Sequence, residues 1–207
     1  MKVIYGINKI RKFRRPVVAL GVFDGVHRGH RDILRGVVRR AHRIKGTSVV
    51  LTFWPHPQKK ESLYSLEHRL RLIEEMGVEA CIVVTFNQRF AAIPAGLFIK
   101  DILFEKIGAK EIFVGENFRF GRNAGADANT LKSLAPLYNY RVKVFSIIRI
   151  GNKTVSSTYI RSLIKKGKLY LAGNLLARPV SILGTVISGM RVGRRLGFPT
   201  ANIEAHH

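Results

Sequence analysis

The sequence predicts an α/β domain with a mainly parallel sheet, followed by the start of a second unit rich in β-structure. The first observation is that short apolar runs alternate with longer segments whose apolar residues recur at helical spacing. The second is that each short run is apolar throughout, as expected of parallel strands that are buried on both faces. The third is that this alternation stops after residue 179, where β-like runs lie between glycines without a helical period.

Each element of the first domain follows from its own pattern. The predicted strands are short and apolar, and they cover residues 16–23, 48–53, 80–86, 111–115 and 141–150. The predicted helices carry one apolar face, and they cover residues 31–46, 65–77, 95–108, 127–138 and 156–167. Asp127 is a candidate N-cap, and Gly46 and Gly77 are candidate helix terminators. Strands that alternate with helices in this way form βαβ units, so we expect a parallel sheet.

Length and composition bound the domain organisation. The chain has 207 residues, of which 46% are hydrophobic, and this suffices for one substantial core with a small second unit. We expect a first domain at residues 1–179 and the beginning of a second at residues 180–207. The 28 residues after Pro179 are fewer than an ordinary domain needs.

The charge balance is strongly basic. Lys and Arg number 36 against 13 Asp and Glu, which gives a formal net charge of +23. Such a charge favours anionic partners, and we expect non-specific affinity for nucleic acid. The alternative is a basic surface that is merely solvated. The spread of the cations through periodic, foldable segments favours this alternative.

Three features bear on the compartment. No apolar run reaches about 18 residues, so neither a membrane span nor a membrane partner is expected. The N-terminal stretch is basic but lacks a long apolar region with a cleavage site, so a secretory signal is not expected. The single cysteine, Cys81, cannot form an internal disulfide. Together these features predict a cytoplasmic protein, and they leave its oligomeric state open.

The stretch GVFDGVHRGH, residues 21–30, lies where the first strand should turn into a helix. Ligands of open parallel sheets bind at the carboxyl ends of strands, and the unpaired N–H groups of a helix N-terminus favour phosphate. His27 and His30 are three residues apart, so they share a face if the helix begins here, and their imidazoles can donate hydrogen bonds to phosphate. The alternative is a pair of surface histidines beside a simple turn. The candidate phosphate-binding residues of the turn are Gly21, Phe23, Asp24, Gly25 and Gly29.

A second helix start carries the stretch SSTYIR, residues 156–161. Residues 151–167 contain no Asp or Glu, although first turns of helices commonly carry one. Hydroxyls and N–H groups at this helix start could hold a phosphate, with Arg161 as a fork of donors. The alternative is an ordinary serine cap with a solvated arginine. The candidate hydroxyl residues are Ser156, Ser157 and Thr158.

The stretches GVFDGVHRGH and SSTYIR together resemble the H-x-G-H and S-S-T-x-x-R signatures of the nucleotidylyltransferase superfamily. More narrowly, the chain resembles the bacterial bifunctional riboflavin kinase/FAD synthetase family. Trp54, Asn87 and Ala177 stand where an acidic residue, Asp and Gly are common in that family. The stretches that carry the resemblance follow the family's order over nearly the whole chain: TFWPHP, FNQRFA, VGENFRFGRNAG, SSTYIR and GRRLGFPTANI.

The resemblance implies a Rossmann-like nucleotidylyltransferase domain that transfers AMP from ATP to FMN and gives FAD and pyrophosphate. It implies that His27, His30 and Arg161 act on the ATP phosphates, with Mg²⁺ bridging phosphate oxygens and no protein ligand assigned to it. A flavin ring also needs an apolar slot with polar groups at its edge. The implied flavin-binding residues, for which a role in the core is the alternative, are Phe53, Asn117 and Phe118.

The segment after Pro179 resembles the first strands of the riboflavin kinase domain, a β-barrel. Thr200 and Asn202, in the stretch PTAN, would meet the Mg²⁺-nucleotide of that kinase. Because an unclosed barrel leaves strand edges unpaired, we expect riboflavin kinase activity only in a chain that carries the later strands of the domain. Two other functions remain open: a different small-substrate nucleotidylyltransferase, and a basic nucleic-acid-binding protein without catalysis.

Overall fold

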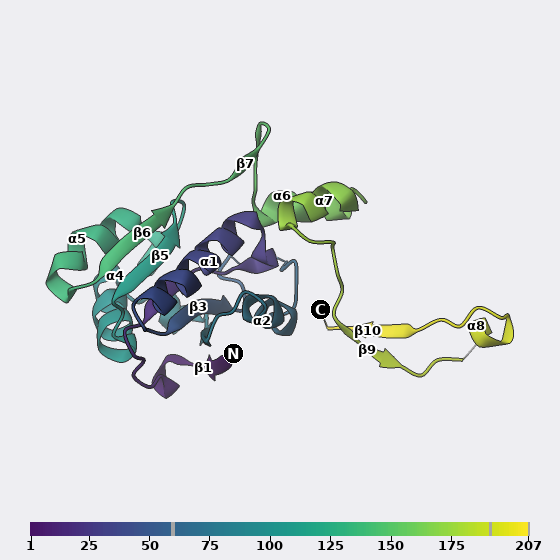
Figure 1. The fold of residues 1–207 in the computed structure, drawn as a ribbon, viewed down its shortest axis with the longest axis horizontal. Coiled ribbons are helices and arrows are strands. Elements are labelled where there is room, and N and C mark those ends of the chain that lie inside the picture. Colours follow the sequence, from purple (N-terminus) through teal and green to yellow (C-terminus); the bar gives the residue numbers. More distant parts are fainter. Residues whose placement is uncertain (59–60, 191, 207) are drawn as a thin grey trace.

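The computed structural model describes residues 1–58, 61–190 and 192–206. Its centre is a six-stranded sheet with the order β1-β4-β3-β2-β5-β6, and every neighbouring pair is parallel (Figure 1). The parallel α/β fold expected from the sequence is therefore confirmed. The strands of this sheet are β1 (Lys2–Tyr5), β2 (Val17–Leu20), β3 (Ser48–Trp54), β4 (Ala80–Thr85), β5 (Glu111–Gly115) and β6 (Arg141–Phe145).

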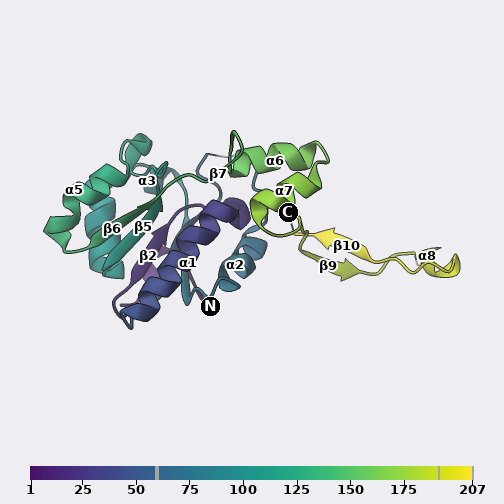
Figure 2. The ribbon, with the colours of Figure 1, turned by 45° about the horizontal axis from the view of Figure 1, so that its top comes forward.

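Helices cover both faces of the sheet (Figure 2). On one face the apolar side of α1 packs on the strands, with Leu34 and Val50 in one buried cluster, and on the other face Leu131 of α5 lies in a cluster with Val18. Each such side chain contributes about 1.5–3 kcal/mol when fully buried. Within the described residues, no helix is long and apolar enough to cross a membrane. The helices of this domain are α1 (Arg28–Arg43), α2 (Leu66–Glu74), α3 (Gln88–Ala91), α4 (Ala95–Leu97), the π-helical segment η3 (Phe98–Ile107), α5 (Ala128–Tyr138), α6 (Ser157–Lys165) and α7 (Leu169–Leu176).

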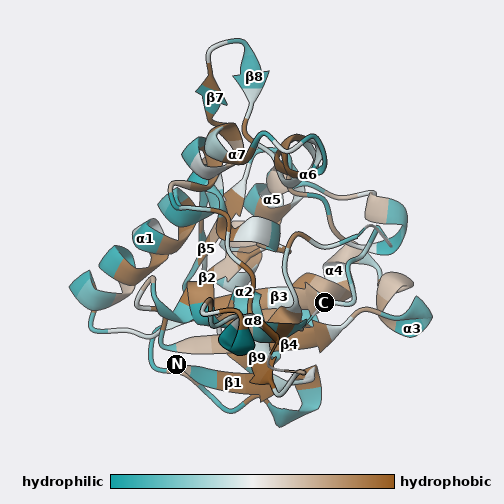
Figure 3. Ribbon diagram, turned by 90° about the vertical axis from the view of Figure 1, so that its right-hand side faces the viewer, coloured by the Kyte–Doolittle hydropathy of each residue, from teal (hydrophilic) through white to brown (hydrophobic). Residues whose placement is uncertain are grey.

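Two strands, β2 and β6, are several residues shorter than the sequence predicts. β2 ends at Leu20 because the chain leaves the sheet and turns through the short helix η2 (Asp24–Val26) towards α1. β6 ends at Phe145 rather than at residue 150. Beyond it, β7 (Arg149–Ile150) and β8 (Lys153–Thr154) pair in a small antiparallel hairpin that projects from the domain (Figure 3).

Other elements differ from the prediction because their local signal is short. β1 was not predicted, since its four residues are too few to show a period; it pairs with β4 at the sheet edge, with Lys2 opposite Ala80. α3 was not predicted either, and α7 lies in a stretch that we had left without an element. α1 begins at Arg28 rather than at residue 31, because the side chain of His27 caps it.

Beyond α7 the chain forms an antiparallel pair, β9 (Gly184–Ile187) and β10 (Asn202–Ala205), with the short helix α8 (Val192–Arg195) between them. This hairpin extends away from the sheet domain (Figures 1 and 2). The predicted change from alternating elements to β-structure after residue 179 is confirmed. The terminal residue His207 lies outside the described residues.

Candidate active site

A cavity of about 680 Å³ lies beside the carboxyl ends of β2 and β5. The strand order reverses there, because β3 and β5 flank β2 on opposite sides, and ligands of open parallel sheets bind at such a switch point. The volume falls within the range of roughly 300–1,000 Å³ that is usual for small-molecule sites. We call residues 21–30 the histidine turn. Several residues of this turn line the cavity, together with the start of α6 and the loop after β5.

The two histidines of the turn stack on each other at the start of α1. His27 is the N-cap, and its Nδ1 accepts a hydrogen bond from the backbone N–H of His30 at 3.4 Å. The centroids of the two imidazole rings are 3.6 Å apart, with 18° between the ring planes. Because Nδ1 of His27 accepts, the neutral ring carries its proton on Nε2, which is free to donate to a ligand. Both histidines line the cavity.

Both imidazoles are neutral at neutral pH. Burial, assisted by the nearby Arg178 guanidinium, lowers the pKa of His27 from 6.5 to about 4. Burial also lowers the pKa of His30 well below its usual value, with smaller contributions from His27 and Arg69. The two imidazoles therefore offer hydrogen-bond donors to an anion without carrying a charge themselves, and arginine supplies the positive charge of the site.

The histidine turn has a backbone conformation that few sequences adopt. Phe23, Gly25 and Val26 have φ angles of 54°, 79° and 40°, all in the left-handed region. This region is strained for Val26, whose side chain is β-branched. Gly25 suits its position because a Cβ there would lie 2.6 Å from the side chain of Leu63. Such a turn persists only where its surroundings hold it.

Asp24 is the buried anchor of the turn. Its carboxylate accepts hydrogen bonds from the N–H of Leu63 at 2.8 Å and from Nη2 of Arg161 at 3.0 Å. The hydroxyl of Ser157 donates to the backbone carbonyl of Asp24 at 2.8 Å. Asp24 is 1% exposed, and in the described part of the chain neither it nor Gly25 is among the residues that line the cavity. We expected both residues to bind phosphate, but the structure places them outside the described cavity lining.

Three further hydrogen bonds, made by two arginine side chains, bind the turn to the segment around the end of α7. Arg178 donates through Nη2 to the carbonyl of Gly25 at 2.7 Å and through Nη1 to the carbonyl of Val26 at 3.1 Å. Arg28 donates through Nε to the carbonyl of Asn174 at 2.6 Å. Sequence reasoning missed these contacts because the partners lie more than 140 residues apart, at separations of 146 to 153.

The start of α6 faces the same cavity. Ser156 is the N-cap, and its hydroxyl oxygen accepts from the N–H of Tyr159 at 3.3 Å. Two buried nitrogens of cavity-lining side chains, Nδ1 of His30 and Nε of Arg161, have no hydrogen-bond partner within the described residues. Buried polar atoms are nearly always paired, so these two fit a bound polar ligand. The cavity-lining residues of the SSTYIR stretch are Ser156, Ser157, Thr158 and Arg161.

Another part of the lining is aromatic. Phe53, Asn117 and Phe118, the residues predicted to contact a flavin, all line the cavity. Phe86 and Phe90 line it too, with ring centroids 6.1 and 5.8 Å from that of Phe53. We did not predict these two as site residues. The available signal was a pair of phenylalanines four positions apart, the first of them the last residue of a predicted strand.

A buried cation supports the floor of the site. Arg69 of α2 is 0% exposed, and its Nη1 donates to the carbonyls of Val22 at 3.0 Å and of Phe53 at 3.3 Å. Its guanidinium lies 5.2 Å from the centroid of the Trp54 ring. The Trp54 side chain thus packs against this arginine, and Trp54 is not among the described residues that line the cavity. Sequence reasoning missed Arg69 because it sits among the apolar residues of an ordinary helical pattern.

The side-chain oxygen atoms that line the cavity belong to hydroxyls and amides. Among the described lining residues there is no Asp or Glu. In the described ranges, no three His, Cys, Asp or Glu side chains are grouped so that they could hold a metal ion. Mg²⁺ is commonly bound through substrate phosphates and water, so this lining fits a cation that arrives on a phosphate ligand.

The stretch PTAN belongs to a separate cavity in the C-terminal hairpin. Thr200 and Asn202 line a space of about 470 Å³ together with residues of β9 and α8. The described lining of this second cavity shares no residue with the first. The two predicted sites therefore lie in different parts of the chain.

Two family models match the chain. The model described as FAD synthetase matches residues 9–159, and the model described as riboflavin kinase matches residues 176–207. The first match includes every described lining residue of the first cavity except Arg161, and the second includes the C-terminal hairpin.

Several curated relatives share the name bifunctional riboflavin kinase/FMN adenylyltransferase. The relative from Buchnera aphidicola subsp. Schizaphis graminum is 35% identical over 99% of this chain and 68% of its own length. The relative from Escherichia coli strain K12 is 34% identical over 98% of this chain and 68% of its own length. A crystal structure from Streptococcus pneumoniae, described as a macrolide-efflux protein, superposes with a TM-score of 0.86 at 28% identity, over 100% of this chain and 70% of that chain.

Proposed function

Because this chain belongs to the FAD synthetase family, we propose that it transfers AMP from ATP to FMN and forms FAD and pyrophosphate. The observation that carries the proposal is one cavity that joins the histidine turn, the start of α6 and a group of aromatic rings. Donors without partners suit the phosphates of both substrates, and the aromatic lining suits the flavin ring.

The triphosphate of ATP would lie between the histidine turn and the start of α6. His27 and His30 would donate hydrogen bonds to its oxygens, and Arg161 would bind the pyrophosphate as it leaves. The hydroxyls of Ser156 and Thr158 and the open N–H groups of the first turn of α6 would complete the cradle. The lining on the side of the histidine turn also includes Gly21, Phe23 and Gly29.

The side chains of Asp24 and Ser157 would position the residues that contact the phosphates, without contacting the phosphates themselves. The carboxylate of Asp24 fixes one end of the Arg161 guanidinium, which leaves its Nε for a ligand. The hydroxyl of Ser157 is engaged by the turn, so its contribution to phosphate binding would come from its backbone N–H. We therefore propose that Asp24 and Gly25 shape the site without touching ATP.

In the proposed reaction, a phosphate oxygen of FMN attacks the α-phosphorus of ATP. The new bond joins that oxygen to the phosphorus, while the bond from the phosphorus to the bridging oxygen breaks and pyrophosphate leaves with the electron pair. A phosphate monoester is already anionic near neutral pH, so no strong general base is needed. The side chains position the two phosphates and stabilise the charge that develops on the leaving group. Bound Mg²⁺ would neutralise part of that charge on the phosphate oxygens.

The flavin ring would occupy the aromatic part of the cavity. Phe53 and Phe118 would contact its faces, with Phe86 and Phe90 extending the apolar surface. Asn117 is exposed at the loop after β5 and offers both a donor and an acceptor to the polar edge of the ring.

For the domain organisation, we propose an FMN adenylyltransferase domain at residues 1–179 and the N-terminal part of a riboflavin kinase domain at residues 180–207. The end of α7 at Leu176 and the separate cavity at Thr200 and Asn202 support this boundary. The riboflavin kinase match begins at residue 176, close to this boundary, and the FAD synthetase match ends before it, at residue 159.

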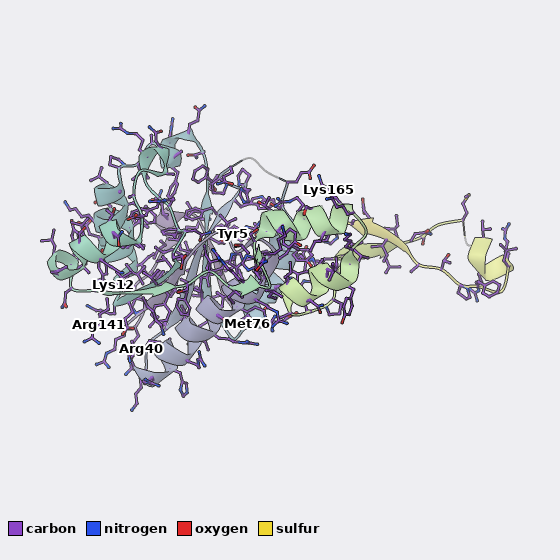
Figure 4. All side chains as sticks on the ribbon, turned by 90° about the horizontal axis from the view of Figure 1, so that it is seen from above. Tyr5, Lys12, Arg40, Met76, Arg141 and Lys165 are labelled. Carbon is purple, nitrogen blue, oxygen red and sulfur yellow. The ribbon has the colours of Figure 1, made fainter. Side chains whose placement is uncertain are left out.

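We also propose weak, non-specific binding of nucleic acid at the amino ends of the strands. Loops there are joined by the hydrogen bonds from Thr47 N–H to the Arg14 carbonyl and from Lys110 N–H to the Pro16 carbonyl, both 2.9 Å. Figure 4 places Lys12 and Arg141 at one end of the molecule, with Lys165 of α6 well away from them. The exposed cations of these loops and of the helix and strand ends beside them are Arg11, Lys12, Arg14, Arg15, Arg43, Lys45, Lys110 and Arg141.

A substrate panel tests the proposed activity. The chain is incubated with Mg²⁺ and ATP plus FMN, ATP plus riboflavin, or CTP plus choline phosphate, and the products are separated by chromatography. We expect FAD, and pyrophosphate in equal amount, from ATP plus FMN. A different nucleotide conjugate without FAD would place the chain among other nucleotidylyltransferases, and no product with any pair would support the non-catalytic alternative.

A further inference from the structure

Arg178 lies beyond α7, within the residues that the riboflavin kinase model matches, yet its side chain binds the histidine turn. α7 ends at Leu176, and Ala177 has a left-handed backbone with φ of 56°. The backbone N–H of Arg178 then donates to the carbonyl of Gly173 at 3.2 Å, which fixes the chain as it leaves the helix. From this position the guanidinium reaches a turn that is 152 residues away in sequence.

The guanidinium is held by contacts of several kinds. Separate nitrogens donate to the carbonyls of Gly25 at 2.7 Å and Val26 at 3.1 Å, and Nη1 is also 3.4 Å from the carbonyl of Leu176. The guanidinium carbon lies 5.3 Å from the centroid of the Tyr64 ring. Only a planar fork can serve two neighbouring carbonyls and stack on a ring at the same time. A lysine at this position would offer one compact charge instead.

The carbonyls that Arg178 binds belong to the two residues directly before His27. One of them, Val26, has the strained φ of 40°, so an external partner is needed to keep this conformation. On the other side of His27, Arg28 is tied to the carbonyl of Asn174 at 2.6 Å. Hydrogen bonds to residues 174–178 therefore hold the backbone on both sides of His27. Because the His30 ring stacks on the His27 ring, the position of His27 also affects that of His30.

We propose that Arg178 is a positioning residue for AMP transfer, which holds the histidine turn so that His27 and His30 can meet the phosphates. It does not line the described cavity, so it acts through the turn and not on the substrate. It also ties the segment matched by the riboflavin kinase model to the site of AMP transfer. This inference rests on the proposed function, and the tests below keep the two apart.

The first test is steady-state kinetics of FAD formation by the full chain carrying Arg178→Lys or Arg178→Ala. A misplacement near 1 Å lowers rates about 10²-fold, so we expect kcat to fall roughly 10- to 100-fold in both variants while KM for FMN stays within about threefold. Added guanidinium should restore part of kcat in Arg178→Ala only. The matched control is Arg40→Ala, which removes an arginine that binds Glu111 at 2.7 Å far along α1 and should leave kcat unchanged. A kcat within twofold of the parent in both Arg178 variants would overturn the proposal.

The second test does not depend on activity. NMR titration of the His27 ring in the chain without substrates should give a pKa near 4 for the parent and a clearly higher pKa for Arg178→Ala. The variant lacks the positive charge near the ring, and the ring is no longer held in its buried position. An unchanged titration with a folded spectrum would show that Arg178 does not hold His27, even if kcat falls. If the parent makes no FAD but the titration shifts as expected, the proposed function fails and the positioning role stands.

Discussion

Acidification should destabilise the folded chain through His27. The ordinary pKa of histidine is 6.5, and burial with the nearby Arg178 lowers that of His27 to about 4 in the folded chain. The folded state therefore binds fewer protons between these two values. Stability from the neutral ring is fully present above pH 6.5 and is lost as pH falls towards and through 4. At about 1.4 kcal/mol for each pH unit, the total loss is about 3 kcal/mol, and the stacked His30 titrates in the same direction.

The matched variant for this prediction is His27→Asn. Asparagine is also a good N-cap and can accept from the same backbone N–H, but it does not titrate. Urea unfolding is measured for both chains from about pH 7.5 to about pH 4.5, where the parent should lose roughly 2–3 kcal/mol more than the variant. Parallel pH profiles of the two chains would refute the reasoning, because they would show that His27 keeps an ordinary pKa in the folded state.

Three further predictions use other parts of the structure. Ala177→Gly should raise Tm by roughly 2–4 °C in a thermal melt, because Ala177 has φ of 56° and relief of this strain is worth about 1 kcal/mol; an unchanged or lower Tm would contradict it. Asp24→Asn should cost about 3–5 kcal/mol in urea unfolding and lower kcat, since it leaves the guanidinium of Arg161 without its buried partner; parental values of both would contradict it. Fluorescence anisotropy with single-stranded nucleic acid should give a Kd of about 10⁻⁴–10⁻⁶ M at physiological salt that weakens steeply as salt rises, and tight binding at high salt would favour the nucleic-acid-binding alternative.

Local patterns predicted much of the fold. β5 occupies the residues that were expected, and Asp127 caps α5 with hydrogen bonds from the N–H groups of Asn129 and Thr130. In both cases the deciding interactions lie within a few residues of sequence. The start of α1 was misplaced because the capping group is a histidine, which is not among the usual cap residues. β1 was missed because its place is set by pairing with β4, which lies more than 70 residues away.

The residues of the candidate site were easier to predict than their arrangement. The histidine turn and the start of α6 were each recognisable as helix starts, and the parallel sheet implied that helix starts of this kind meet at one edge. The hydroxyl of Ser157, the carboxylate of Asp24 and the guanidinium of Arg178 form bonds across the fold instead. Nothing in a local pattern distinguishes such an aspartate from one that binds a ligand. Its role follows from burial, which only the folded chain determines.

The central claim is that the neutral imidazoles of the histidine turn stabilise the transfer of AMP to FMN in this cavity. The single-turnover rate of FAD formation by the His30→Ala chain, with saturating ATP and Mg²⁺, tests it most directly. Phe118→Ala serves as the matched cavity variant, which should weaken FMN binding more than it slows the chemical step. The account predicts that His30→Ala slows the step by roughly 10²–10³-fold, with FMN affinity and folding close to those of the parent. A parental single-turnover rate in the His30→Ala chain would contradict it.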